Sequence, residues 1–294
     1  MHKILLATTA LVASSGFAMA GGHISFSGAA DAGYGQDKDG GDAEFYSSAN
    51  FKVSMTGSTD GGTEFGLSMD ASAGGQDYDQ GDFDLDGSES GEFGLGDIWI
   101  SSGGFTISFD HDGKDDLADD AVGEDHDVSV AFSQGGISLE ATIDGEGDGT
   151  TSDSSMSFKG SFDGGAFNAS VAGNDADCTV IGAGYSSGAF SIGVESASTC
   201  GGSSEVNTVT VGYAQDAFDI SVEASDDDSW EVGVGYSDGG LSIGATIAED
   251  SSGNQSTELM ISQDLGGGLS LEAGARQADT DTQDAYYVGA KMSF

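Results

Sequence analysis

Carboxylates are by far the commonest side chains in this sequence that could do chemistry. Asp and Glu number 51, against 7 Lys and Arg and 4 His, and the formal charge is -44. No nucleophile and base stand at a spacing that suggests covalent catalysis, so we expect no enzyme. We also expect no nucleic acid partner, because the chain has no basic surface that could neutralise phosphates.

The segment 82–92 begins like a calcium-binding loop. Its sequence, DFDLDGSESGE, has the Asp-x-Asp-x-Asp-Gly spacing, and carboxylate oxygens are ligands that Ca²⁺ prefers. The acid expected near position 12 arrives one residue early, as Glu92, and no flanking helices are readable. We interpret these acids as solvated loop residues and expect no cofactor. The alternative is loose Ca²⁺ binding through Asp82, Asp84 and Asp86.

The two cysteines are a candidate disulfide. Cys178 and Cys200 lie on either side of a short turn at 186–188. Reflecting Cys178 through that turn lands near Ser196, so Cys200 follows four residues later, in the next loop. We therefore predict a disulfide at the rim of the protein, provided that the compartment is oxidising.

The first twenty residues form a separate segment. Residues 1–3 give a short positive start, residues 4–12 are largely apolar, and Ala-Met-Ala at 18–20 is a small-x-small cleavage site. This pattern predicts a cleaved secretory signal peptide over 1–20, too short for a membrane anchor. We expect one domain over 21–294, exported to the bacterial envelope or beyond it.

Most of the remaining chain repeats one short design. A Gly-rich turn precedes a run of alternating apolar and small or polar residues, as in GGFTISF (103–109) and GGLSIGA (239–245). This period of two is typical of a strand with one apolar face. Leu, Ile, Val and Phe make up only 19% of the chain, as in disordered proteins, but a disordered chain has no reason to keep this phase. The sequence predicts an all-β antiparallel meander.

Aromatic residues collect beside the short turns, in the apolar phase of their strands. In a water-soluble sandwich they would scatter through a shared core, whereas a ring at one level is typical of a transmembrane β-barrel. An open sheet edge cannot persist in lipid, so we expect the sheet to close. Eight short turns predict 18 strands. The aromatic residues of this ring are Phe65, Phe105, Phe132, Phe167, Tyr185, Phe190, Tyr213, Phe218 and Tyr236.

The C-terminal residues alternate up to the end of the chain, from Tyr286 to Phe294. We expect this strand to close on the first strand, at Ile24, Phe26 and then Tyr34. It resembles the last strand of bacterial outer-membrane proteins. That resemblance implies recognition by the barrel-assembly machinery through the Phe294 strand.

Several longer stretches also carry a resemblance. They are FKVSMTGSTDGGTEFGLSMDA (51–71), DIWISSGGFTISFDHDG (97–113), YSSGAFSIG (185–193), and QDLGGGLSLEAG with YYVGAKMSF near the end. Together they resemble the general porins of alphaproteobacteria, the Rhodobacter type within the Gram-negative porin superfamily. The resemblance implies a homotrimer in the lipid and lipopolysaccharide of the outer membrane. Each closed antiparallel barrel would have short periplasmic turns and an inward-folded third external loop. It also implies 16 strands, which we prefer to the 18 from the turns.

The acidic stretch from Asp110 to Asp125 would be this inward loop. It contains eight acids and one base. His111 and His126 bracket it, and we interpret both as solvated loop residues rather than metal ligands. The charged residues of the predicted pore loop are Asp110, Asp112, Lys114, Asp115, Asp116, Asp119, Asp120, Glu124 and Asp125.

Strand phase assigns the other charged residues to the water-filled side of the barrel. Where Phe51 and Val53 face lipid, Lys52 between them faces inward. A base on the lipid face at mid-membrane would cost about 2–4 kcal/mol. The predicted lumen-wall residues are Lys52, Glu64, Asp70, Glu140, Lys159, Glu195, Glu223, Glu231, Glu258, Glu272 and Arg276.

The sequence departs from the family pattern in its bases. Family members commonly oppose an acidic loop with wall arginines, whereas the early strands here offer only Lys38 and Lys52. Rings of acids favour cations, so we expect a cation-selective pore for passive diffusion of ions and small hydrophilic solutes. The alternative is a secreted acidic Ca²⁺-binding surface or adhesion β-protein.

Overall fold

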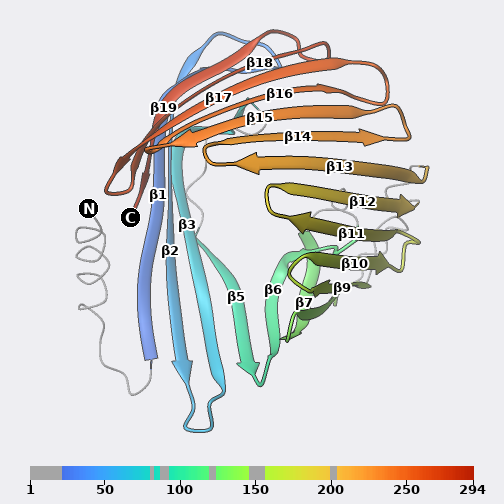
Figure 1. Ribbon diagram of the computed structural model, residues 1–294. Coiled ribbons are helices and arrows are strands. Elements are labelled where there is room, and N and C mark those ends of the chain that lie inside the picture. The colour runs from blue at the N-terminus through green and yellow to red at the C-terminus, as the bar shows by residue number, and fades with distance from the viewer. Residues whose placement is uncertain (1–21, 80–82, 87–92, 119–123, 146–155, 199–203) are drawn as a thin grey trace.

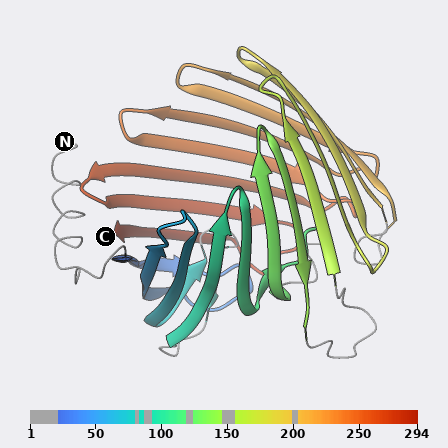
Figure 2. The ribbon, with the colours of Figure 1, turned by 90° about the horizontal axis from the view of Figure 1, so that it is seen from below.

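Eighteen antiparallel strands pair in chain order and close into a barrel wall in this computed structural model (Figure 1, Figure 2). A further short strand, β4 (Asp84–Asp86), pairs only with the end of β3. These counts refer to the residues that the structure describes: 22–79, 83–86, 93–118, 124–145, 156–198 and 204–294. The wall strands are β1 Gly22–Gln36, β2 Glu44–Ser58, β3 Glu64–Asp79, β5 Phe93–Ser102, β6 Phe105–Asp115, β7 Glu124–Gln134, β8 Ile137–Ile143, β9 Met156–Asp163, β10 Phe167–Asn174, β11 Thr179–Ser187, β12 Phe190–Ser198, β13 Val206–Gln215, β14 Phe218–Ser225, β15 Trp230–Asp238, β16 Leu241–Glu249, β17 Gln255–Gly266, β18 Leu269–Ala278 and β19 Ala285–Ser293.

The last strand closes the barrel on the first. Residues 29–36 of β1 pair with 286–293 of β19, while β1 pairs with β2 on its other edge. Gly28 and Phe294 extend this pairing by exchanging backbone hydrogen bonds of 3.3 and 2.9 Å. The predicted closure is confirmed at Tyr34, which pairs with Val288, whereas Ile24 and Phe26 lie before the paired part of β1.

The two faces of each strand differ in polarity as the alternation predicts. On β14, Phe218 and Val222 point outward and are 63% and 43% exposed, whereas Asp219 and Glu223 lie on the other face. Exposed apolar side chains of this kind recur on almost every strand of the wall. Such an outer surface is unfavourable in water but suits lipid. Among the described residues, no helix is long and apolar enough to cross a membrane.

The strand count of 18 from the turns is right, and the count of 16 implied by the resemblance is wrong for this chain. Each of the eight predicted short turns joins two strands of the wall, including the hairpin between β9 and β10. Several of these turns need glycine. At Gly136, for example, φ is +83°, and an added Cβ would lie 2.3 Å from the carbonyl oxygen of Asp163.

Aromatic pairs stand beside four of these short turns. The first residue of one strand packs on a ring of the neighbouring strand, as Phe105 does on Phe132 with ring centroids 4.6 Å apart. The same arrangement recurs at Phe190 and Tyr213, at 4.8 Å. Cross-strand aromatic pairs stabilise a sheet beyond the area that they bury. The other two pairs are Phe167–Tyr185 and Phe218–Tyr236.

Candidate functional site

The inner wall of the barrel collects the polar and charged side chains. The predicted lumen-wall residues lie in the strand phase opposite to the exposed apolar side chains, as Glu195 does beside Val194 and Glu223 beside Val222. Pairing places some of them directly opposite each other on adjacent strands: Lys52 and Asp70, Glu140 and Lys159, and Glu258 and Arg276. The remaining members are Glu64 on β3, Glu195 on β12, Glu223 on β14, Glu231 on β15 and Glu272 on β18.

Ion pairs hold three of the inner bases. Lys52 lies 3.7 Å from Asp70, and both side chains are half exposed. Lys114 pairs with Asp97 on β5. The third base is on β18, where Arg276 pairs with Glu258 and, at 3.0 Å, with Asp281.

Two of these acids were missed by the sequence prediction. Asp97 stands just before the alternating residues at the end of β5. The register between β3 and β5 shifts at this point, and no local sequence pattern reveals the shift. Asp281 lies in the connection between β18 and β19, and its side chain is only 5% exposed. Only the pairing of the strands shows that both acids meet bases.

Two other acids of the inner wall, Glu223 on β14 and Glu272 on β18, meet hydroxyl groups instead of bases. Glu223 accepts a hydrogen bond from Thr210 Oγ1 at 3.1 Å and stands directly opposite Glu231. Glu272 accepts one from Ser270 Oγ at 2.9 Å. In the described part of the chain, this stretch of wall is therefore acidic without an ion pair at these positions.

The predicted pore loop is shorter than expected, because the flanking strands continue into it. β6 runs to Asp115 and β7 begins at Glu124, so Asp110, Asp112 and Lys114 are strand residues. A register shift between Phe109 and Lys114 marks where β6 departs from regular pairing. Asp125 also belongs to β7, while Asp119 and Asp120 lie outside the described residues.

The described part of this loop lies against the inner face of the wall. Asp116 is 1% exposed and accepts a hydrogen bond of 3.0 Å from Asn174 Nδ2 on β10. The backbone N–H of Leu117 donates to Ser157 Oγ on β9 at 2.8 Å. Ser157 in turn shares a hydrogen bond of 2.6 Å with Thr142 on β8, and both side chains are buried. The segment 116–118 thus lies inside the barrel.

Cys178 lies beneath the same segment. It is 2% exposed, and its Sγ is 3.1 Å from the carbonyl oxygen of Ala118. It is not a free thiol. Thr179 pairs with Ser198, so reflection of Cys178 lands at position 199 rather than near Ser196. Cys200 lies outside the described residues, so its pairing with Cys178 stays a prediction.

The positions of His126 and of the candidate calcium ligands can be compared with the sequence predictions. His126 is fully buried on β7, so its interpretation as a solvated loop residue is wrong. Asp84 gathers with Asp37 and Asp39, and one oxygen of each carboxylate lies within 4.8 Å of the others. Burial and the neighbouring Asp37 raise the pKa of Asp84. Asp82 lies outside the described residues, and the Asp86 side chain is not described.

Exposed turns at the end of the barrel opposite the aromatic pairs carry further acids. The side-chain and backbone N–H groups of Asn254 hold the pKa of Asp250 below its usual value. Asn207 does the same for Asp226 through its backbone and side-chain N–H groups. Both carboxylates therefore stay ionised at lower pH than an ordinary aspartate.

Comparison with known proteins agrees with this architecture. The family model described as Gram-negative porin matches residues 7–294. Among solved structures, a triple mutant of Rhodopseudomonas blastica porin aligns with a TM-score of 0.59 and 17% identity, over 92% of this chain and 100% of that one. Another mutant form of the same porin has a TM-score of 0.61 and 15% identity, with the same coverage. No curated protein sequence matches the chain.

Proposed function

The chain belongs to the Gram-negative porin family and forms an outer-membrane channel, and we propose that this channel favours cations and passes small hydrophilic solutes by diffusion. The observation that supports this proposal is that three bases of the lumen are paired with acids, while some acids have no base beside them in the described part of the chain. Lys52, Lys114 and Arg276 are held by acids, whereas Glu223 and Glu231 stand opposite each other and form no ion pair with any described base. An acidic lining raises the local concentration of cations and lowers that of anions.

The test is a reversal-potential measurement in a planar bilayer across a KCl gradient. We expect the wild-type channel to favour K⁺. The double variant E223Q/E231Q removes the unpaired wall charge and should reduce this preference. Its matched control is D228N, in an exposed turn outside the wall. Chloride preference in the wild type would contradict the proposal, and so would equal selectivity in E223Q/E231Q and wild type.

The assembly of the channel is part of the proposal. We expect a homotrimer in outer-membrane lipid and lipopolysaccharide, delivered with a signal peptide over 1–20 that is then cleaved. The barrel-assembly machinery would recognise the strand that ends at Phe294. Unheated gel electrophoresis of detergent extracts, with the N-terminal sequence of the mature chain, tests these points together.

A disulfide between Cys178 and Cys200 is also proposed. The register between β11 and β12 supports it, because Thr179 and Ser198 form the last pair, Cys178 directly precedes Thr179, and Cys200 comes two residues after Ser198. Intact mass after alkylation without reduction checks it: two alkylated thiols would exclude the bond.

The alternative, a secreted Ca²⁺-binding β-protein, has one observation in its favour, the cluster of Asp37, Asp39 and Asp84. A water-soluble protein would have to cover the apolar outer face, which the structure leaves exposed. Fractionation separates the two functions: the channel requires detergent for extraction, whereas the alternative would be soluble and would unfold with a chelator.

A further inference from the structure

A second segment inside the barrel, the described residues 83–86, comes between β3 and β5 in the chain. Its residue Phe83 is fully buried, although its backbone has a φ of +57° that a bulky side chain rarely adopts. The ring packs on Tyr287 of β19, with centroids 5.6 Å apart, and lies over Gly274 of β18. Both residues belong to the inner face, since Tyr286 and Val288 point outward and are exposed.

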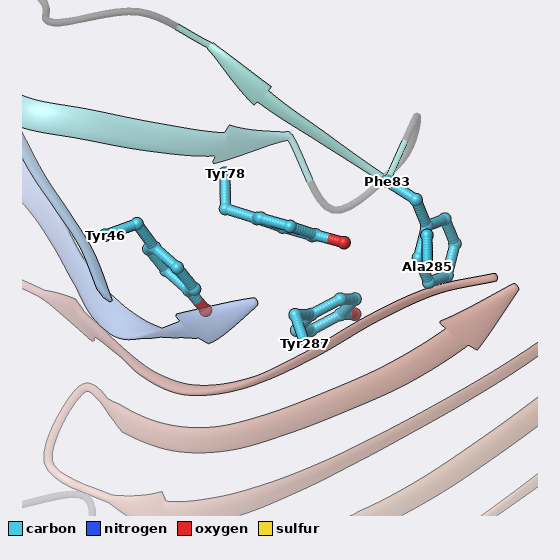
Figure 3. Packing of buried hydrophobic residues seen from close by; sticks show 5 residues of the cluster. All are labelled: Tyr46, Tyr78, Phe83, Ala285 and Tyr287. Carbon is cyan, nitrogen blue, oxygen red and sulfur yellow. The ribbon is translucent and has the colours of Figure 1, made fainter. Parts of the chain in front are cut away.

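Three tyrosines complete this cluster around Phe83 (Figure 3). Tyr78, at the end of β3, lies between Tyr46 of β2 and Tyr287, with ring centroids 5.2 Å from each. All three are at most 4% exposed, and Ala285 at the start of β19 is 1% exposed. Gly274 is four residues before the end of β18, so the contacts of Phe83 lie within the length of the wall strands and not only at their ends.

Hydrogen bonds hold the same segment to the rim of β1. The backbone N–H of Lys38 donates to the carbonyl oxygen of Phe83 at 3.1 Å. The N–H of Leu85 donates to Asp37 Oδ2 at 3.4 Å, and the hydroxyl of Tyr78 donates to the carbonyl of Gln36 at 3.1 Å. The segment is therefore fixed both by packing and by polar contacts.

The two inward segments lie on opposite walls. The segment 116–118 contacts β9 and β10, and Asp115 just before it contacts Thr142 of β8, whereas β4 and Phe83 contact β18, β19 and β1. These groups of strands are about half the circumference apart in the order of the 18-stranded ring.

We propose that Phe83 anchors a second constriction segment, so that the size limit of the pore is set between it and segment 116–118. Phe83 is a positioning residue in this role: its ring is covered and holds β4 inside the lumen, where the backbone of β4 takes up cross-section. This inference rests on the proposed diffusion function.

Liposome swelling with sugars of increasing size tests the proposal. In F83S a polar side chain replaces the buried ring, and we expect the largest excluded sugars to enter while the rate for the smallest sugar changes little. F83L keeps an apolar side chain and should retain most of the wild-type limit. F45S is the matched control, because Phe45 is 82% exposed on the outer face beside Tyr46.

Thiol labelling gives an independent readout of the same segment. In A285C the introduced thiol is covered, so a membrane-impermeant maleimide should react slowly. Adding F83S should raise the labelling rate about tenfold, as for a segment that opens locally. T282C, exposed in the same connection, should react rapidly with or without F83S.

The outcomes separate the two proposals. A wild-type protein that passes no sugar contradicts the diffusion function. If the wild type passes small sugars, but F83S has the same size limit and the same A285C labelling rate as the wild type, the second constriction alone is overturned. If F83S does not assemble, A285C in the wild-type background still decides: labelling much slower than that of T282C supports the anchor, and labelling as fast as that of T282C overturns it.

Discussion

Glycines on the inner wall decide where the tyrosine rings lie. A Cβ at Gly33 or Gly289 would stand 2.4 or 2.3 Å from the hydroxyl oxygen of Tyr46. Tyr46 thus spans two neighbouring strands, β1 and β19, at the closure of the barrel. Flat packing of a ring over glycine fills the space that the missing side chain leaves.

Replacing Gly289 with alanine should therefore destabilise the protein. The methyl group forces Tyr46 to move, and overpacking of this kind costs about 1–3 kcal/mol. G244A is the control, because Gly244 is an inner-wall glycine of β16 with no atom within 4 Å of an added Cβ. The free energy of unfolding from denaturant titration in detergent checks both variants, and an equal loss in the two would refute the contact argument.

At the scale of elements, the connection between β6 and β7 is held to the wall by a few polar contacts. The buried carboxylate of Asp116 accepts from Asn174 and also from the backbone N–H of Ala118 at 2.7 Å. Loss of one partner leaves a buried charge less well satisfied, which is costly. The position of the loop should thus depend strongly on this single asparagine.

The variant N174A should release segment 116–118 and make single-channel current noisier, with a broader distribution of conductance. N168A is the matched control, because Asn168 lies on the same strand and the same face but away from the loop. Single-channel recordings in a planar bilayer compare the two. Identical current traces from N174A and N168A would show that this contact does not fix the loop.

Adjacent positions of one strand test the assignment of the two faces. Val222 points to lipid and Ser221 to the lumen of β14. A lysine on the lipid face at mid-membrane costs about 2–4 kcal/mol, so V222K should fold poorly. S221K should assemble normally and lower the preference for cations. Yields of heat-modifiable protein and reversal potentials measure the pair; normal assembly of V222K would contradict the assignment.

At the scale of the whole molecule, the chain has 51 acids and 7 bases, and most of those in the described residues lie on the inner wall or in the connections. A barrel needs only its outward face to be apolar, which explains how a chain poor in large apolar residues forms an extensive fold. The closed ring leaves no free sheet edge among the described wall strands. The charge excess is concentrated where water is present.

The cation preference should fall with rising salt and with falling pH. The Debye length shrinks from about 10 Å at 0.1 M to about 3 Å at 1 M, so wall charges act over less of the pore. Acid removes the charge of carboxylates, which in an ordinary glutamate happens near pH ~4.3. The hydrogen bonds of Asn207 and Asn254 hold the pKa values of Asp226 and Asp250 below their usual range, so these two turns keep their charge to lower pH. Reversal potentials over KCl concentration and pH check this; no change in either series would rule out a charge-based preference.

The sequence by itself determined the class of fold and the two faces of the strands. Its short turns indicated 18 strands, but the choice between 18 and the preferred 16 was decided by the structure. Alternation and glycine turns are local, so residues such as Phe218 and Glu223 could be assigned to a face without a structure. The tertiary structure decided which distant residues meet. The pairing of Lys114 with Asp97, the extension of β6 into the predicted loop and the packing of Phe83 on Tyr287 depend on register shifts and long-range closure. Local periodicity carries no information about such long-range contacts, because it determines which face of the strand a side chain occupies but not which residue of another strand it meets.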